Sequence, residues 1–159
     1  MRVDDRLVHG QVTQGWGSRL HPDRLVIAND RVAADEWERS LYEASAPEGM
    51  EVSVVRIDEA AERTDGWLAD KEDLLLLIED PLDALRLHES GISFDNLNLG
   101  GLHSREGRRK VLSYVWVDEE DVAALRRLRE RGVDVSCADV PGCDRKDFFE
   151  CLGSAGSGT

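Results

Sequence analysis

The stretch Asp73-Leu74-Leu75-Leu76-Leu77-Ile78-Glu79 is an unbroken aliphatic run with an acidic residue at each end. A run of this length without polar alternation is typical of a strand that is buried on both faces, as in the middle of a parallel sheet. Asp80 and Pro81 follow at once, and they suit the N-cap and the first position of a helix. We therefore predict a strand over residues 73–79 and a helix from Pro81 to about Glu89, which together form one strand–helix unit of an α/β fold.

The same alternation continues on both sides of this unit. Short apolar stretches bounded by polar residues predict strands, and stretches with apolar residues three or four positions apart predict helices. This order of elements implies an open, mostly parallel sheet with helices on both faces, and we predict a single three-layer α/β domain over residues 1–152. The further predicted strands are 24–30, 51–57, 96–101, 114–117 and 133–140, and the further predicted helices are 32–46, 59–69 and 119–131.

Asp58 and Asp118 are placed to cap the helices that follow them.

Residues 153–159 are rich in glycine and serine and lack an apolar anchor, so we predict that they are disordered. The segment from Ser104 onward is predicted to be helical or irregular. Its basic cluster is assigned to a solvated helix face, with contact to an acidic partner or a phosphate as the alternative; the cluster comprises Arg105, Arg108, Arg109 and Lys110.

The composition argues against several classes of protein. The 159 residues include 33 acidic and 20 basic ones, which gives a formal net charge of −13 at pH 7. A chain this acidic is poorly suited to bind nucleic acid or an anionic membrane surface. The aliphatic run 74–78 is too short to span a bilayer, which takes about 20 residues, and charged residues occupy the start of the chain, where a signal peptide needs an apolar core. We therefore expect a cytoplasmic protein without direct membrane insertion.

The cysteines and histidines do not form a recognisable metal or disulfide pattern. Cys137, Cys143 and Cys151 are odd in number, and their spacing matches no common zinc site. No two histidines have the helical spacing of a metal site, and the chain contains neither a nucleotide-binding phosphate loop nor a dinucleotide-binding glycine motif. We therefore interpret the cysteines as packing or surface thiols and expect no metal site.

The densest polar segment is Arg2-Val3-Asp4-Asp5-Arg6-Leu7-Val8-His9-Gly10-Gln11. Val12, Trp16 and Leu20 follow at four-residue intervals, which predicts a helix and places His9 in the loop just before it. The N–H groups of a first helical turn attract anions, and an arginine three residues before the histidine can bind a phosphate with two hydrogen bonds. Because neutral imidazole is nucleophilic near neutral pH, these residues indicate a phosphoryl carrier.

The residues alone leave a second interpretation open, in which His9 is a capping or surface histidine among salt-bridged neighbours. In an open parallel sheet a site lies at the carboxyl ends of the strands. The polar and glycine residues there are candidates for the rest of a pocket, and His103 is close enough in sequence to approach them. These candidates are Asn29, Asp30, Glu79, Asp80, Asn98, Gly100 and Gly101.

The segment 2–12 resembles the active-site loop of the enzyme IIB component of the mannose/fructose/sorbose class of the bacterial phosphotransferase system. The family pattern is close to Arg-Ile/Val-Asp-Asp/Asn-Arg-Leu-Ile/Val-His-Gly-Gln-Val, and this chain meets every position. Weaker similarities follow in the same order, and the resemblance covers roughly residues 1–152. They lie at Asn29-Asp30, Val32-Ala33-Ala34-Asp35, Ala46-Pro47-Glu48-Gly49 and Asn98-Leu99-Gly100-Gly101.

The resemblance implies a phosphotransferase subunit that needs no metal or organic cofactor. His9 would accept a phosphoryl group on Nδ1 from a phosphohistidine of the IIA component, and would pass it to a sugar held by the membrane components IIC and IID. Arg6 would hold the phosphate, while Arg2 and Asp5 would shape the loop. The site would also be lined by Gly10, Gln11, Asn29, Asp30, Gly100 and Gly101.

Two alternatives to a transport role remain at the level of sequence. The chain could be a regulatory phosphoprotein that is phosphorylated on His9 without sugar transport, or a binding domain in which His9 is inert. The sequence also departs from the family in one respect, because several apolar residues usually precede the first arginine and form the opening strand. Here Met1 comes directly before Arg2, so we expect the opening strand to be truncated.

Overall fold

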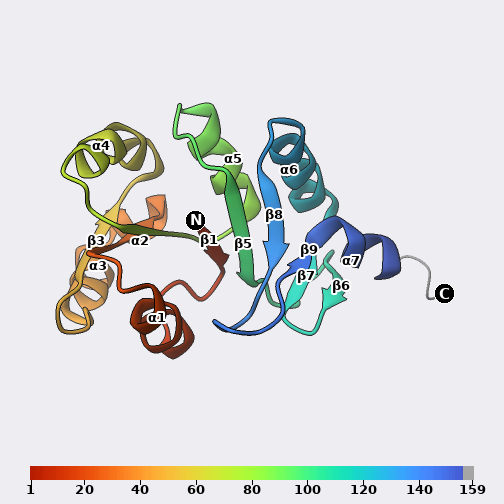
Figure 1. Cartoon of the computed structure of the whole chain (residues 1–159), viewed down its shortest axis with the longest axis horizontal. Helices are drawn as coiled ribbons and strands as arrows, with labels where there is room; N and C mark the ends of the chain where they lie inside the picture. Colours follow the sequence, from red (N-terminus) through yellow and green to blue (C-terminus); the bar gives the residue numbers. More distant parts are fainter. Residues whose placement is uncertain (156–159) are drawn as a thin grey trace.

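The computed structural model describes residues 1–155, and for Gln11 and Thr13 it describes the backbone only. Within these residues a seven-stranded sheet has the order β3-β2-β4-β1-β5-β8-β9 (Figure 1). All neighbouring strands from β3 to β8 pair in parallel, and β9 alone pairs antiparallel, with β8. The strands are β1 (Arg2–Asp4), β2 (Arg24–Ala28), β3 (Glu51–Val55), β4 (Leu74–Ile78), β5 (Asn96–Gly101), β8 (Asp134–Cys137) and β9 (Lys146–Asp147).

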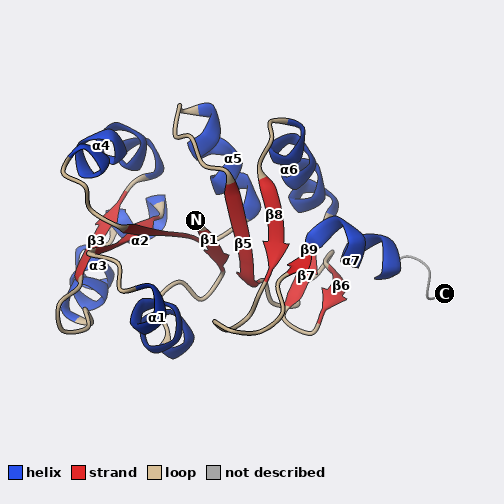
Figure 2. Ribbon diagram, viewed as in Figure 1, coloured by secondary structure: helices blue, strands red, loops and turns tan. Residues whose placement is uncertain are grey.

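Helices cover both faces of this sheet (Figure 2). Alternate residues of the central strands divide between two apolar clusters, so that Leu76 and Ile78 of β4 belong to one and Leu75 and Leu77 to the other. The predicted three-layer α/β domain with a mostly parallel sheet is thereby confirmed. The first cluster packs under α4 (Ile57–Ala69), α5 (Pro81–Glu89) and α6 (Glu119–Glu130), and the second under η1 (Gln11–Gly17), α2 (Asp30–Ala34) and α3 (Glu36–Ala44).

The aliphatic run 74–78 forms β4, an interior strand of the sheet, and the predicted helix cap after it is confirmed. Four of its five residues are fully buried, as expected for a strand with a helix layer on each face. The Asp80 carboxylate accepts the N–H of Asp83 at 2.9 Å, and Pro81 is the first residue of α5. Asp118 caps α6 in the same way and forms a reciprocal capping box with Asp121. Local residue chemistry therefore sets both helix starts.

Two predicted helix boundaries are wrong. The predicted helix 32–46 is divided into α2 and α3, because Asp35 is extended (φ −101°, ψ 103°) and its carboxylate accepts the N–H groups of Trp37 and Glu38. Asp35 is thus the N-cap of α3, and it lies inside the stretch whose apolar spacing predicted a single helix. The helix after β3 begins at Ile57, so that Arg56 and not Asp58 is its N-cap residue.

The segment from Ser104 to Arg108 is irregular, which is one of the two predicted alternatives, and the strand predicted at 114–117 is present as β7 (Val115–Val117). The strand β6 (Arg109–Leu112) was not predicted, and it forms an antiparallel hairpin with β7 outside the main sheet. Arg108 does not lie on a solvated helix face, because its side chain is fully buried and its Nε lies 3.2 Å from Oδ2 of Asp121, which is also fully buried. A tertiary ion pair to α6 therefore fixes the start of the hairpin, and a local sequence pattern does not show such a contact.

The opening strand was predicted to be truncated, and the end of the chain was predicted to be disordered. The opening strand is present as the three-residue β1, which pairs on both sides, with β4 and β5. The sequence analysis missed α7 (Phe148–Ala155), which buries Phe148 and Leu152. The predicted disorder of 153–155 is therefore wrong, and residues 156–159 lie outside the described part of the chain.

All three cysteines are free thiols. Cys137 is buried, Cys143 is exposed and Cys151 is half-buried. Burial raises the pKa of Cys137 to about 12, which makes it an inert packing group. In the described part of the chain, no helix combines the length and apolar character needed to cross a membrane.

The buried pair of Arg108 and Asp121 leads to a stability prediction. Burial raises the pKa of Asp121 against the charge of Arg108, so this carboxylate depends on its partner. The substitution Arg108→Met should therefore lower the free energy of unfolding by about 3–5 kcal/mol, measured by urea denaturation. The double variant Arg108→Met/Asp121→Asn, which buries no unpaired charge, should recover much of the loss. A single variant as stable as the wild type would contradict this account.

Candidate functional site

The central strand β1 carries the polar residues of the site on one face. Successive strand residues point to opposite faces, and Val3 packs in the cluster under α4, α5 and α6. Arg2 and Asp4 therefore share the other face, where the guanidinium of Arg2 lies 4.9 Å from the ring centroid of Trp16 in η1. The start of the chain thus brings two charged side chains into the layer beneath the His9 loop.

Arg2 is almost completely buried and makes several hydrogen bonds. Its Nη1 donates to Oδ1 of Asn98 at 2.7 Å and to the backbone oxygen of Ala138 at 2.9 Å. Its Nη2 donates to Oδ2 of Asp4 at 3.0 Å and to the backbone oxygen of Asp139 at 3.1 Å. Burial lowers the pKa of Arg2, and the charge of Asp4 opposes that effect. The guanidinium therefore joins the ends of β1, β5 and β8.

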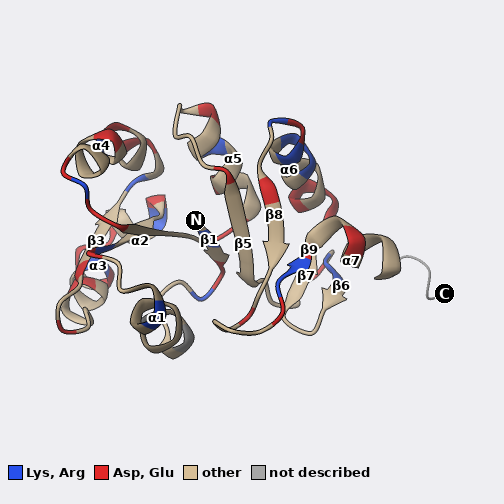
Figure 3. Ribbon diagram, viewed as in Figure 1, with Lys and Arg blue, Asp and Glu red and all other residues tan. Residues whose placement is uncertain are grey.

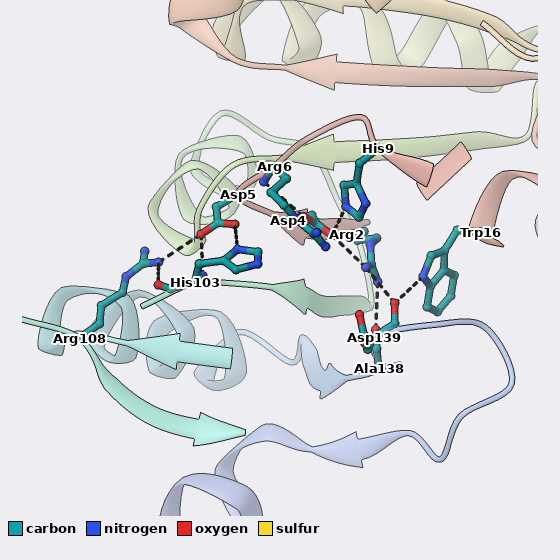
Figure 4. A network of polar contacts seen from close by, with 10 residues as sticks. All are labelled: Arg2, Asp4, Asp5, Arg6, His9, Trp16, His103, Arg108, Ala138 and Asp139. Carbon is teal, nitrogen blue, oxygen red and sulfur yellow. Dashed lines mark hydrogen bonds and ion pairs between the residues drawn. The ribbon is translucent and has the colours of Figure 1, made fainter. Parts of the chain in front are cut away.

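Asp4 connects this buried arginine to His9 (Figure 4). The Asp4 carboxylate is fully buried, and its Oδ2 lies 2.9 Å from Nε2 of His9, whose side chain is 17% exposed. Its Oδ1 accepts the backbone N–H of Arg6 at 3.3 Å and lies 3.8 Å from Nε of Arg6, whose side chain is 47% exposed. One carboxylate therefore contacts the histidine and both arginines of the segment.

The sequence analysis did not single out Asp4, although the signal was present. Asp4 stands two residues after Arg2 in a strand, so the two side chains share a face. Asp5, which the resemblance placed in the site, has other partners. Its Oδ1 lies 2.5 Å from Nδ1 of His103, and its Oδ2 accepts the His103 backbone N–H at 2.6 Å. Asp5 therefore connects the loop to His103, which follows β5. Its Oδ2 also lies 3.7 Å from Nη1 of Arg108, and Figure 4 shows these contacts.

Gly100 and Gly101 make room for the buried pair. A Cβ atom on Gly100 would lie 1.8 Å from Cζ of Arg2, and one on Gly101 would lie 3.0 Å from Oδ1 of Asp4. Because β1 pairs with β5, any side chain at these two positions would occupy the space of the guanidinium or the carboxylate. The predicted strand-end glycines therefore lie in the site for a steric reason.

Asn29 and Asp30 do not join this network. Oδ1 of Asn29 accepts the N–H of Val32 at 2.9 Å, and its Nδ2 donates to Glu79 at 2.6 Å. Asp30 accepts the N–H of Ile57 at 2.9 Å and pairs with Arg86, also at 2.9 Å. Both side chains therefore fix the starts of helices, which corrects their assignment as site-lining residues.

The remaining predicted residues lie beside His9. Gly10 is the N-cap residue of η1, and the side chain of Gln11 lies outside the described atoms. A pocket of about 410 Å³ opens next to His9, between the loop and α3. No group of three or more potential metal ligands occurs among the described residues. The pocket is lined by Val8, His9, Gly10, Gln14, Leu41, Tyr42 and Ser45.

Comparison with known proteins shows what this chain is similar to. A family model described as the PTS system sorbose subfamily IIB component, where PTS is the phosphotransferase system, matches residues 1–158. The sorbose-specific EIIB component of Klebsiella pneumoniae is 36% identical over 132 residues, which cover 83% of this chain and 80% of that protein. The mannose-specific EIIAB component of Escherichia coli K12 is 34% identical over 139 residues, which cover 87% of this chain but only 43% of that protein.

A solved structure supports the same comparison. The crystal structure of the IIBSor domain of the sorbose permease from Klebsiella pneumoniae matches with a TM-score of 0.90 and 32% sequence identity. The match covers 96% of this chain and 94% of that one. The likeness therefore includes the whole sheet and its helix layers, and not only the segment around His9.

The close approach of Gly100 to Arg2 leads to a prediction. The substitution Gly100→Ala should displace the guanidinium and lower the free energy of unfolding by about 1–3 kcal/mol, since overpacking a dense core costs that much. Thermal denaturation would measure the loss. Gly66→Ala in α4 is the matched control, because a Cβ there meets no atom within 4 Å and alanine favours a helix. Equal stability of the two variants would contradict the steric argument.

Proposed function

This chain belongs to the family of PTS sorbose-subfamily IIB components, and we propose that its part in sugar phosphotransfer is carried by His9. His9 takes a phosphoryl group from a phosphohistidine of a IIA protein and passes it to a sugar held by IIC and IID membrane components. IIB components are phosphotransferases in the general sense. The observation that supports the proposal most is the 2.9 Å contact between His9 Nε2 and the buried Asp4 carboxylate.

This contact supports Nδ1 as the reacting nitrogen. The Asp4 carboxylate, 2.9 Å from Nε2, favours the neutral tautomer with its proton on Nε2, and that tautomer carries its lone pair on Nδ1. As Nδ1 attacks phosphorus, the bond between phosphorus and the donor histidine breaks, and its electron pair stays with the donor ring. His9 keeps its Nε2 proton throughout, so its ring gains positive charge. The Asp4 carboxylate stabilises that charge at the place where it develops.

Arg2 acts through Asp4. The Arg2 guanidinium lies 3.0 Å from the Asp4 oxygen that faces His9. Because Arg2 is itself bonded to Asn98 and to the backbone of Ala138, the ion pair holds the carboxylate in place against the imidazole. Arg2 is therefore a positioning residue, and its burial keeps it from competing for the phosphate.

Arg6 is the group in this segment that can hold the phosphoryl oxygens. It precedes His9 by three residues, and nearly half of its side chain is exposed beside the Asp4 carboxylate. A guanidinium binds phosphate through paired hydrogen bonds and stays charged at neutral pH. Arg6 offsets the charge that arrives on an otherwise acidic chain, and the sugar hydroxyl then attacks the same phosphorus in the second step.

Labelling from phosphoenolpyruvate through enzyme I, HPr and the cognate IIA protein tests the carrier role. We expect acid-labile label on the wild type and none on His9→Ala, because His9 is the histidine that lies against the buried Asp4 carboxylate and follows the half-exposed Arg6 by three residues. His21→Asn is the control, since this exposed residue has a left-handed backbone that asparagine tolerates (φ 47°). A folded wild type without label would contradict the proposal. Label that never reaches sugar in the presence of IIC and IID would favour the regulatory role instead.

The Asp4 contact predicts a second result. Asp4→Asn removes the negative charge beside Nε2 and should slow phosphoryl transfer on the order of 100-fold, a typical share for such proton and charge assistance. Asp5→Asn is the matched control and should slow transfer far less, because Asp5 pairs with His103. Rapid-quench measurement of the transfer rate, with near-UV circular dichroism as a check of folding, would show the difference. A larger effect at Asp5 would contradict this assignment of roles.

A further inference from the structure

A second histidine is held by a carboxylate with a buried arginine behind it. Oδ1 of Asp5 lies 2.5 Å from Nδ1 of His103, and Oδ2 of Asp5 lies 3.7 Å from Nη1 of Arg108. The Arg108 side chain is fully buried, whereas the His103 side chain is 52% exposed. These three residues therefore repeat the arrangement found at His9, in which a buried guanidinium, a carboxylate and an imidazole follow one another.

The two imidazoles differ in the nitrogen that faces the carboxylate. At His9 this nitrogen is Nε2, whereas at His103 it is Nδ1. The Asp5 carboxylate therefore favours the neutral tautomer of His103 with its proton on Nδ1, and that tautomer carries its lone pair on Nε2. Because Nε2 faces away from Asp5 on a half-exposed side chain, it can accept a proton from a ligand.

Both arrangements are built on the same loop. Asp4 and Asp5 are consecutive, with Cα atoms about 3.8 Å apart, and the next residue is Arg6, which would hold the phosphoryl oxygens. The backbone N–H of Asp5 donates at 2.9 Å to the oxygen of Gly101, two residues before His103. Figure 3 shows acidic and basic positions following each other on the loop after β1, and Figure 4 shows both histidines in one network of contacts. A second imidazole thus lies beside the loop that carries the phosphoryl site.

We propose that His103 is the base that takes the proton of the sugar hydroxyl, an inference that rests on the proposed function. In the transfer to sugar, the hydroxyl oxygen forms a bond to phosphorus. The bond between phosphorus and Nδ1 of His9 breaks, and its electron pair stays on Nδ1. The hydroxyl proton passes to Nε2 of His103, and the Asp5 carboxylate stabilises the positive charge that this ring gains.

The two transfers differ in their need for a base. In the first, a ring nitrogen of His9 attacks with a lone pair and loses no proton. In the second, the nucleophile is a hydroxyl, which is weak until its proton is removed. His9 is not suited to remove it, because its Nδ1 is bonded to phosphorus and its Nε2 carries a proton beside Asp4. A base is therefore needed in the second transfer, and the first is expected to depend on Asp4 and little on Asp5.

Separate rapid-quench measurement of the two transfers tests the proposal. His103→Asn keeps an amide N–H that can reach Asp5, but it has no basic nitrogen. With membranes that contain the cognate IIC and IID components, this variant should slow transfer from His9 to sugar on the order of 100-fold, a usual contribution of a general base. It should slow transfer from the IIA protein to His9 far less. His21→Asn is the matched control, because it makes the same change at another exposed histidine.

The outcomes separate this proposal from the proposed function. Selective loss of the transfer to sugar in His103→Asn, with normal rates in His21→Asn, would support the base. Equal loss of both transfers would assign His103 a structural role, and an unchanged transfer to sugar would assign the base to the membrane components. Either result overturns the proposal and leaves His9 as the carrier. Absence of label on the wild type would overturn the carrier role itself, and label that never leaves the wild type would overturn both the transfer to sugar and its base.

Discussion

The site depends on one buried ion pair, between Arg2 and Asp4 in the middle of the sheet. Both side chains are essentially inaccessible, and removing two charges from water costs several kcal/mol for each ion. That cost is reduced where the charged atoms find partners. The two Nη atoms of Arg2 donate to Asn98, Ala138 and Asp139, while the backbone of Arg6 donates to Asp4 and the ring of His9 lies against it. Burying the pair is a costly way to stabilise the fold, and its contact with His9 gives a reason for its position.

Much of the surrounding structure follows from accommodating this pair. The two glycines at the end of β5 leave the space that the guanidinium and carboxylate fill, and the indole of Trp16 covers the guanidinium. The same indole donates to the backbone oxygen of Asp139, so η1 and the segment after β8 are fastened to each other over the arginine. The three-residue strand β1 is held by both of its neighbours, which lets a very short element carry two buried charged side chains.

The sequence predicts the parts of this structure that depend on local chemistry. The aliphatic run at β4, the caps Asp80 and Asp118 and the loop position of His9 follow from periodicity and from hydrogen-bonding capacity within a few residues. The parts that it does not predict depend on contacts between distant segments. Arg108 looks like a solvated residue until Asp121 of α6 is placed against it, and Asn29 looks like a site residue until its amide is found capping α2. Strand alternation places Asp4 on the face of Arg2, but the contact of Asp4 with His9 and that of Asp5 with His103 appear only in the folded chain.

A phosphoryl carrier has to bind its donor in two charge states and release it after transfer. A phosphoryl group carries about two negative charges at neutral pH, and transfer moves them from one side of the interface to the other. An interface built mainly on charge would change strongly in affinity at each turnover, whereas apolar contact area is indifferent to the location of those charges. Val8 and Leu41 give the wall of the His9 pocket a small apolar area, which suits an encounter that forms and dissociates in every cycle. On the proposed function, charge therefore acts where the phosphoryl group reacts, through the buried pair beside His9, and apolar surface acts where the two proteins meet.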